Sequence, residues 1–93
     1  MPNGTVNVAA DQAPVITLNG DAAVTLNVGE AYADAGATAL DDRDGDLTAD
    51  IVVGGDAVDT DTPGTYVITY NVADSSGNAA TEVTRTVTVE DVD

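Results

Sequence analysis

The residues of this chain best suited to chemistry are a short run of carboxylates, residues 41–46 (DDRDGD). Calcium binds about six to eight oxygen atoms in proteins, and clustered aspartates together with loop carbonyls can supply them. Gly45 allows the tight turn that would offer a backbone carbonyl. The EF-hand pattern fails, because placing Gly45 at its sixth position puts Leu40 where the first aspartate belongs. The run therefore indicates either a calcium site or a solvated acidic turn.

Other carboxylates join this loop in only one of two strand arrangements. If residues 13–18 and 24–28 form one split edge strand running in a single direction, the loop lies at the pole where the domain begins. The long strand that ends at Asp74 reaches the same pole, with Asp11 nearby on the preceding segment. If the two segments instead form a hairpin, Asp74 lies at the opposite pole and simply caps the turn at 75–78.

The first arrangement predicts a calcium site at one pole of the domain. Carboxylates held within several ångströms repel each other by about 1 kcal/mol or more per pair at an effective dielectric of about 20, and a divalent cation reverses the sign of that interaction. The predicted ligands are Asp41, Asp44, Asp46, Asp74 and Asp11.

Short strands must position these residues. Apolar side chains alternate with polar ones along residues 65–73 (TYVITYNVA), which place Tyr66, Ile68, Tyr70 and Val72 on one face. In residues 82–90 (EVTRTVTVE), Arg85 shares one side with three valines. Shorter strands are predicted at 15–18, 24–28, 32–40 and 50–54, with residues 41–46 as a loop between them. About seven short antiparallel strands separated by turns predict an all-β sandwich.

The length of 93 residues provides one domain with one core. Residues 1–12 are predicted to be a linker or N-terminal extension, 13–90 the β-sandwich, and 91–93 the start of a C-terminal linker. The core must be built from aliphatic residues and three tyrosines, because the chain has no Trp, Phe or Cys. Such a β-branched core suits a pleated sheet better than a helix bundle.

The charge balance excludes several classes of function. The chain has 17 acidic residues, two arginines and no histidine, for a net charge of −15. Nucleic acid is excluded as a partner, because phosphate binding requires a basic surface. Direct membrane insertion is not expected either, since no apolar run is long enough to span a bilayer. Without His, Cys or Lys we also predict that the domain is not an enzyme.

The segments GTYVITYNVADSSGN (64–78) and TRTVTV (84–89) resemble the immunoglobulin-like repeats of bacterial surface proteins and, more loosely, the hyalin-repeat family. This resemblance implies an immunoglobulin-like sandwich, repeated in tandem in secreted or surface-anchored chains such as adhesins and extracellular enzymes. In such a sandwich Tyr66, at the head of the strand that follows Pro63-Gly64, would form a tyrosine corner; the alternative is an ordinary core aromatic. A join of VEDVD to a following DQAPV is similar to the calcium linkers of cadherins.

These observations predict a structural or extender module of a secreted or cell-surface bacterial protein, an adhesin-type tandem repeat stabilised by calcium. Its partners would be neighbouring repeats of the same chain, and the isolated domain would be a monomer. The alternative is a ligand-binding module that recognises a glycan, ice or a receptor. Against it, carbohydrate sites usually stack sugars on exposed aromatics, and only three tyrosines exist here. The threonine row at 84, 86 and 88 is too narrow to indicate ice binding.

Overall fold

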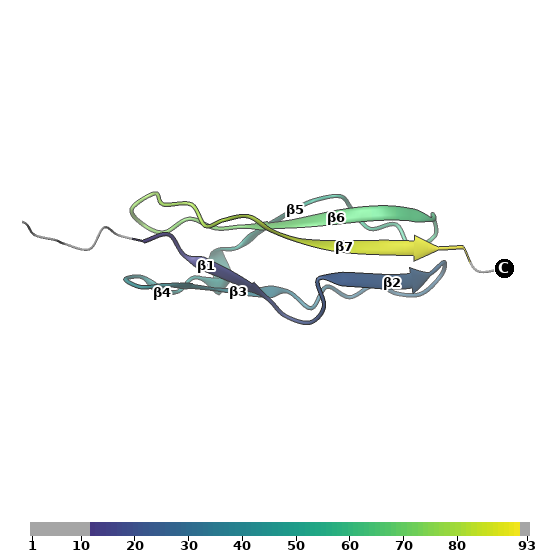
Figure 1. Cartoon of the computed structure of the whole chain (residues 1–93), viewed down its shortest axis with the longest axis horizontal. Helices are drawn as coiled ribbons and strands as arrows, with labels where there is room; N and C mark the ends of the chain where they lie inside the picture. Colours follow the sequence, from purple (N-terminus) through teal and green to yellow (C-terminus); the bar gives the residue numbers. More distant parts are fainter. Residues whose placement is uncertain (1–11, 92–93) are drawn as a thin grey trace, which may run out of the picture.

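The computed structural model describes residues 12–91. This part of the chain forms seven strands and one short 3₁₀ turn (Figure 1). The elements are β1 (Val15–Leu18), β2 (Ala23–Asn27), β3 (Ala37–Asp41), β4 (Gly45–Asp46), η1 (Thr48–Asp50), β5 (Val52–Gly55), β6 (Gly64–Asn71) and β7 (Val83–Glu90).

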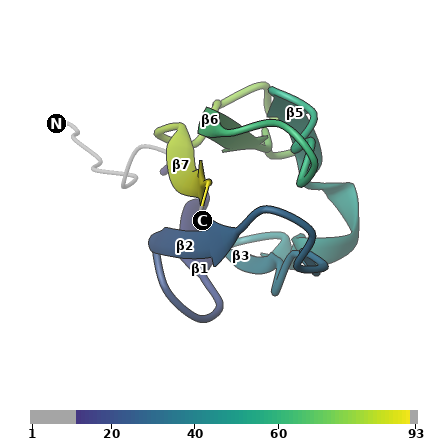
Figure 2. The same ribbon diagram turned by 90° about the vertical axis from the view of Figure 1, so that its right-hand side faces the viewer.

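The strands form two facing sheets (Figure 2). One sheet has the order β1-β3-β4, and the other has the order β2-β7-β6-β5. The β-sandwich predicted from the alternating pattern is confirmed. One pair differs from the antiparallel expectation, because β2 lies parallel to β7 over five residue pairs.

The first strand of the domain is split between the two sheets. Strand β1 pairs antiparallel with β3, whereas β2 pairs with β7 in the other sheet. Both run in the same direction along the long axis of the molecule (Figure 1). The split edge strand is therefore correct and the hairpin is wrong. As a result of this split strand, the turn at residues 42–44 and the end of β6 lie at the same pole, the one where β1 begins (Figure 1).

Two predicted segments differ in their details. The strand expected at 32–40 begins only at Ala37, because Gly36 has a φ of +83° and interrupts the extended backbone. The segment expected to be a loop at 41–46 is a tight hairpin, in which Asp41 pairs with Gly45 across β3 and β4. A ladder forms here because the charged side chains lie in and around the turn, while only backbone groups pair.

The core lies between the inner faces of the two sheets. Tyr70 of β6 and Val87 of β7 are fully buried, and Ala39 of β3 faces them from the other sheet with no exposed surface. Small alanines on β3 allow the sheets to approach closely, which keeps an interior without Trp or Phe densely packed. The buried cluster comprises Ile16, Ala37, Ala39, Ile68, Tyr70, Val72, Ala80 and Val87.

Tyr66 lies at the start of β6, after the turn that contains Pro63. Its hydroxyl donates a hydrogen bond of 2.7 Å to the carbonyl of Thr62, four residues upstream. A tyrosine whose hydroxyl returns to the backbone a few residues earlier is the tyrosine corner of immunoglobulin-like sandwiches. The structure thus favours the tyrosine corner over an ordinary core aromatic.

Candidate functional site

The acidic pole, which we define as Asp41, Asp44 and Asp74, brings together three of the predicted ligands. The contact between its two loops is direct: the Ser75 amide donates to Asp44 Oδ2 at 2.7 Å, and the Ser75 hydroxyl donates to Asp44 Oδ1 at 3.0 Å. Asp41 and Asp74 are buried, with 6% and 7% of their surfaces exposed. The β3–β4 turn and the loop after β6 are therefore joined through carboxylates.

Each buried carboxylate of the acidic pole also organises its own turn. Asp41 Oδ2 accepts hydrogen bonds from the backbone amides of Arg43 and Asp44, at 3.0 and 2.8 Å. Such side-chain-to-backbone bonds stabilise tight turns, and aspartate forms them readily.

Asp74 closes the turn after β6 in the same way. Its Oδ1 accepts from the amides of Ser76 and Asn78, at 2.9 and 2.8 Å, and its Oδ2 accepts from Asn78 Nδ2 at 3.0 Å. Burial raises the pKa of Asp74, but the hydrogen bonds from Asn78 and Ser76 outweigh burial and lower it. Asp74 is therefore held as a carboxylate within a hydrogen-bonded turn.

The remaining predicted ligands are not brought into this cluster by the described residues. Asp46 Oδ1 accepts from the Thr48 amide at 2.9 Å and so starts the 3₁₀ turn. Asp11 lies outside the described residues. Within residues 12–91, no group of three or more acidic side chains is arranged to hold a metal ion. Calcium at this pole stays a prediction.

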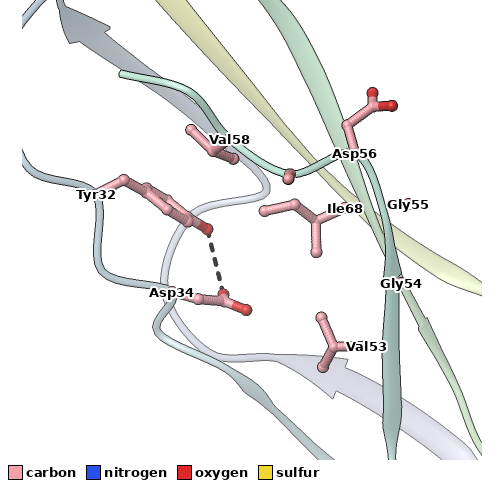
Figure 3. A pocket seen from close by; sticks show the side chains of 9 residues that line it. Tyr32, Asp34, Val53, Gly54, Gly55, Asp56, Val58 and Ile68 are labelled. Carbon is pink, nitrogen blue, oxygen red and sulfur yellow. Dashed lines mark hydrogen bonds between the residues drawn. The ribbon is translucent and has the colours of Figure 1, made fainter. Parts of the chain in front are cut away.

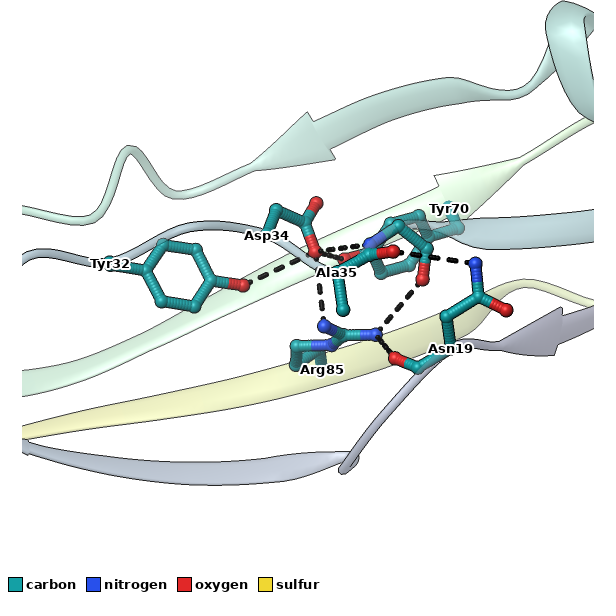
Figure 4. A network of polar contacts seen from close by, with 7 residues as sticks. Asn19, Tyr32, Asp34, Ala35, Tyr70 and Arg85 are labelled. Atoms are coloured by element: carbon teal, nitrogen blue, oxygen red, sulfur yellow. Dashed lines mark hydrogen bonds and ion pairs between the residues drawn. The ribbon is translucent and has the colours of Figure 1, made fainter.

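A second polar cluster, whose members the sequence analysis did not bring together, lies inside the sandwich around Arg85 (Figure 4). Only 1% of the surface of Arg85 is exposed. Its Nη1 lies 3.1 Å from Asp34 Oδ1, and its Nη2 donates to the carbonyls of Asn19 and Gly36, at 2.5 and 3.0 Å. One guanidinium on β7 thus fastens both the β1–β2 link and the segment before β3.

Asp34 is the acceptor at the centre of this Arg85 cluster. Its Oδ1 accepts from the Tyr70 hydroxyl at 2.7 Å, the Tyr32 hydroxyl at 3.3 Å and the Gly36 amide at 3.1 Å. Burial raises the pKa of Asp34, but the hydrogen bonds from Tyr70 and Gly36 and the charge of Arg85 outweigh burial and lower it.

The same contacts act in the opposite direction on Tyr70. Burial raises the pKa of its hydroxyl, and the hydrogen bond to Asp34 raises it further. The Arg85 guanidinium lies 5.7 Å from the centre of the Tyr70 ring, a cation–π distance. Tyr70 therefore remains a neutral donor at all ordinary pH values, and Asp34 remains its charged acceptor.

One signal in the sequence pointed to this cluster. The alternation along residues 82–90 placed Arg85 on the same side as three valines, and an arginine on an apolar face requires a buried acceptor. With 17 acidic residues available, the pattern did not identify the partner. Asp34 was missed because residues 32–36 were assigned to a strand rather than to the loop that folds its carboxylate inward.

Two facing sheets, a first strand split between them and a tyrosine corner define an immunoglobulin-like β-sandwich. The family described as bacterial surface protein, Ig-like domain, matches residues 16–89, and the chain belongs to it. No curated protein matches the sequence. In the part of the chain that the structure describes, no helix has the length and apolarity needed to cross a bilayer.

Solved structures contain similar domains. A lipoprotein from Bacteroides thetaiotaomicron has a TM-score of 0.75 and 30% sequence identity, over 86% of this chain and 39% of that one. A structure from Clostridium perfringens, with an M60 catalytic domain and two CBM51 domains, has a TM-score of 0.61 and 28% identity, over 85% of this chain and 8% of that one. The chain thus corresponds to a minor part of both proteins.

Proposed function

We propose that this chain is a load-bearing spacer module in a secreted or cell-surface bacterial protein, set between neighbouring domains or repeats and without catalytic activity of its own. The family supports a place in a bacterial surface protein. The two similar structures support the use of this fold as one part of a larger chain, because it covers 39% and 8% of their lengths.

The observation that carries this proposal is the direction of the strands at the two ends of the domain. The described chain enters β1 at one pole, and β7 ends at the opposite pole (Figure 1). Because β2 and β7 are parallel, tension between the termini slides one strand along the other. In this shear geometry all backbone hydrogen bonds between β2 and β7 bear the force together. If the strands were instead pulled apart from one end, the bonds would break one after another. The ladder extends from the bond between the Thr86 amide and the Ala22 carbonyl to that between the Val28 amide and the Glu90 carbonyl, both 2.8 Å.

Arg85 reinforces this ladder. Its guanidinium binds the Asn19 carbonyl in the link between β1 and β2, so the link is tied to β7 from inside the sandwich. A force that draws β1 out of the domain would therefore have to break a charge-assisted hydrogen bond before it reached β2. This contact therefore supports the proposal that the domain stays folded while it transmits tension between its ends.

Single-molecule force spectroscopy of a tandem array of this domain tests the proposal. In parallel pairing, alternate residues of β2 face β7, so Val28 donates to the ladder while the amide of Thr25 points to the open edge. We expect Val28→Pro to lower the unfolding force, because proline removes the amide that bonds to Glu90. Thr25→Pro is the matched control and should retain a force close to that of the parent, since proline is tolerated where the amide faces solvent.

Equal unfolding forces for Val28→Pro, Thr25→Pro and the parent would contradict the proposal, because the ladder between β2 and β7 would then bear no load. Forced unfolding depends on the unfolding rate rather than on equilibrium stability. The three proteins should therefore also be compared by chemical denaturation, so that a general loss of stability is recognised.

Calcium remains a separate proposal, namely that the acidic pole binds this ion with help from Asp11. Its support is Asp41 Oδ1, a buried carboxylate oxygen that has no hydrogen-bond partner among the described residues. The described carboxylates do not suffice by themselves, since no three are arranged for a metal. The proposal therefore depends on the segment before Gln12.

Thermal melting of the full chain and of a chain beginning at Gln12, each after EDTA and with calcium or magnesium, tests this dependence. A ligand at about 100 times its dissociation constant adds roughly 2.7 kcal/mol to the stability of the folded state. We expect a rise in Tm with calcium for the full chain only, and its loss on Asp44→Asn. If neither chain responds, the pole is held by its hydrogen bonds and the spacer is metal-free.

A further inference from the structure

Strand β5 is an open edge of the larger sheet. It pairs with β6 on one side only, and all four of its residues are exposed. Val52 and Val53 expose 67% and 55% of their surfaces. An edge with exposed apolar side chains is where another strand can add to a sheet.

The backbone of this edge offers unpaired hydrogen-bonding groups. The Asp56 amide donates to the Val67 carbonyl of β6 at 2.8 Å. Residues of an antiparallel strand alternate between facing the partner and facing away. The residues two and four before Asp56 therefore face β6, and the N–H and C=O groups of Val53 point outward.

A cavity of about 350 Å³ opens directly beside this edge, between β5 and the segment before β3 (Figure 3). Its apolar lining includes the Tyr32 ring, Val53, Val58 and Ile68. The register pairs Val53 with the buried Tyr70, so the side chain of Val53 lies on the inner side of the sheet. Side chains of a strand added to β5 would alternate in the same way, and every second one would point into this cavity.

Asp34 presents a carboxylate oxygen to this cavity. Asp34 uses Oδ1 for its contacts with Arg85, Tyr70, Tyr32 and Gly36. Its Oδ2 points into the cavity in Figure 3. The side chain of Asp34 is 28% exposed, so a ligand can reach this oxygen.

The charge of the cavity indicates what kind of side chain could bind there. No basic side chain lines the cavity, and the carboxylate that faces it is that of Asp34, because Asp56 is turned away and accepts from the Val67 amide. A second copy of this chain would bring a further net charge of −15 to the same edge, which opposes a dimer of two identical edges. A basic side chain with an aliphatic stem matches both the apolar walls and the carboxylate at their end.

We propose that β5 and this cavity bind an extended segment of another protein, which pairs with the edge strand and places a lysine or arginine side chain against Asp34. Backbone pairing along β5, centred on Val53, would supply affinity, and the charged pocket would supply selectivity, as in other cases of strand addition. This inference goes beyond the spacer role and does not depend on it.

A phage library of random ten-residue peptides, panned against the full chain, tests the proposal. We expect enriched peptides with alternating β-branched residues and one basic residue, and an amide NMR titration of such a peptide should shift residues 52–56. Replacing the basic residue by norleucine should weaken binding about tenfold or more, the effect of losing about 1.4 kcal/mol.

Two variants of the domain distinguish binding at the proposed site from non-specific peptide binding. Val53→Pro removes an outward amide of the edge and should abolish binding. Val53→Lys places an ammonium group in the cavity and should compete with the peptide while leaving the edge backbone intact. Failure of the library to enrich basic peptides, or equal binding of an enriched peptide to the parent and both variants, would overturn the proposal.

Discussion

Replacing Arg85 by methionine is expected to lower the free energy of unfolding by about 3 kcal/mol, the lower end of the range for breaking a buried ion pair. Methionine retains much of the volume but leaves the Asn19 carbonyl without the Arg85 donor, while the Gly36 carbonyl keeps only its bond from the Asn19 amide. It also leaves the Asp34 carboxylate without its counter-charge. Because the Asp34 side chain is 28% exposed, water relieves part of the cost, which excludes the upper end of the range.

Urea denaturation measures this loss, which would be a large fraction of the roughly 5–15 kcal/mol that stabilises most domains. Asp34→Asn in the Arg85→Met background provides the control, because it removes the unpaired charge while retaining acceptors for Tyr70 and Gly36. The double variant should recover part of the stability. A loss below about 1 kcal/mol for Arg85→Met would show that the Arg85 cluster does not hold the sheets together.

The Arg85 cluster illustrates which features of the fold the sequence could predict and which it could not. Alternation along residues 65–73 and 82–90 defined the two central strands, because each buries one face and exposes the other. The pairing of β1 and β2 with different sheets was not decidable locally, since both segments show the same period-two pattern. The structure ties the link between β1 and β2 to β7 through a contact across 66 positions, from Arg85 to the Asn19 carbonyl, which no local pattern contains.

At the acidic pole, the predicted strand arrangement showed which loops lie together, although no sequence motif did. The run at 41–46 matches no metal-binding pattern, yet the split-strand arrangement correctly brought Asp44 close to the loop that follows Asp74. The sequence could not show how the oxygens are used. Asp41 and Asp74 each bind backbone amides of their own turns, which depends on dihedral angles rather than on residue types.

Replacing Gly55 by alanine is expected to lower the free energy of unfolding by about 3 kcal/mol, the upper end of the cost of a residue held in an unfavourable backbone region. Gly55 has a φ of +86°, where an L side chain is strained. A Cβ atom there would also clash with the Val67 carbonyl oxygen and lie 3.2 Å from the Thr69 nitrogen. Both atoms belong to the backbone of β6, which is fixed by its pairing with β7 and cannot move aside without disturbing the larger sheet.

Gly77→Ala is the matched control for this substitution. Gly77 has a φ of +90°, close to that of Gly55, but a Cβ atom at Gly77 meets nothing within 4 Å. Its loss should therefore reflect the backbone conformation alone, about 1–2 kcal/mol. The difference between the two variants, measured by urea denaturation, isolates the contact with β6. Equal losses would mean that β5 can move away from β6 at its last residue, and the edge that we propose as a docking strand would then end at Gly54.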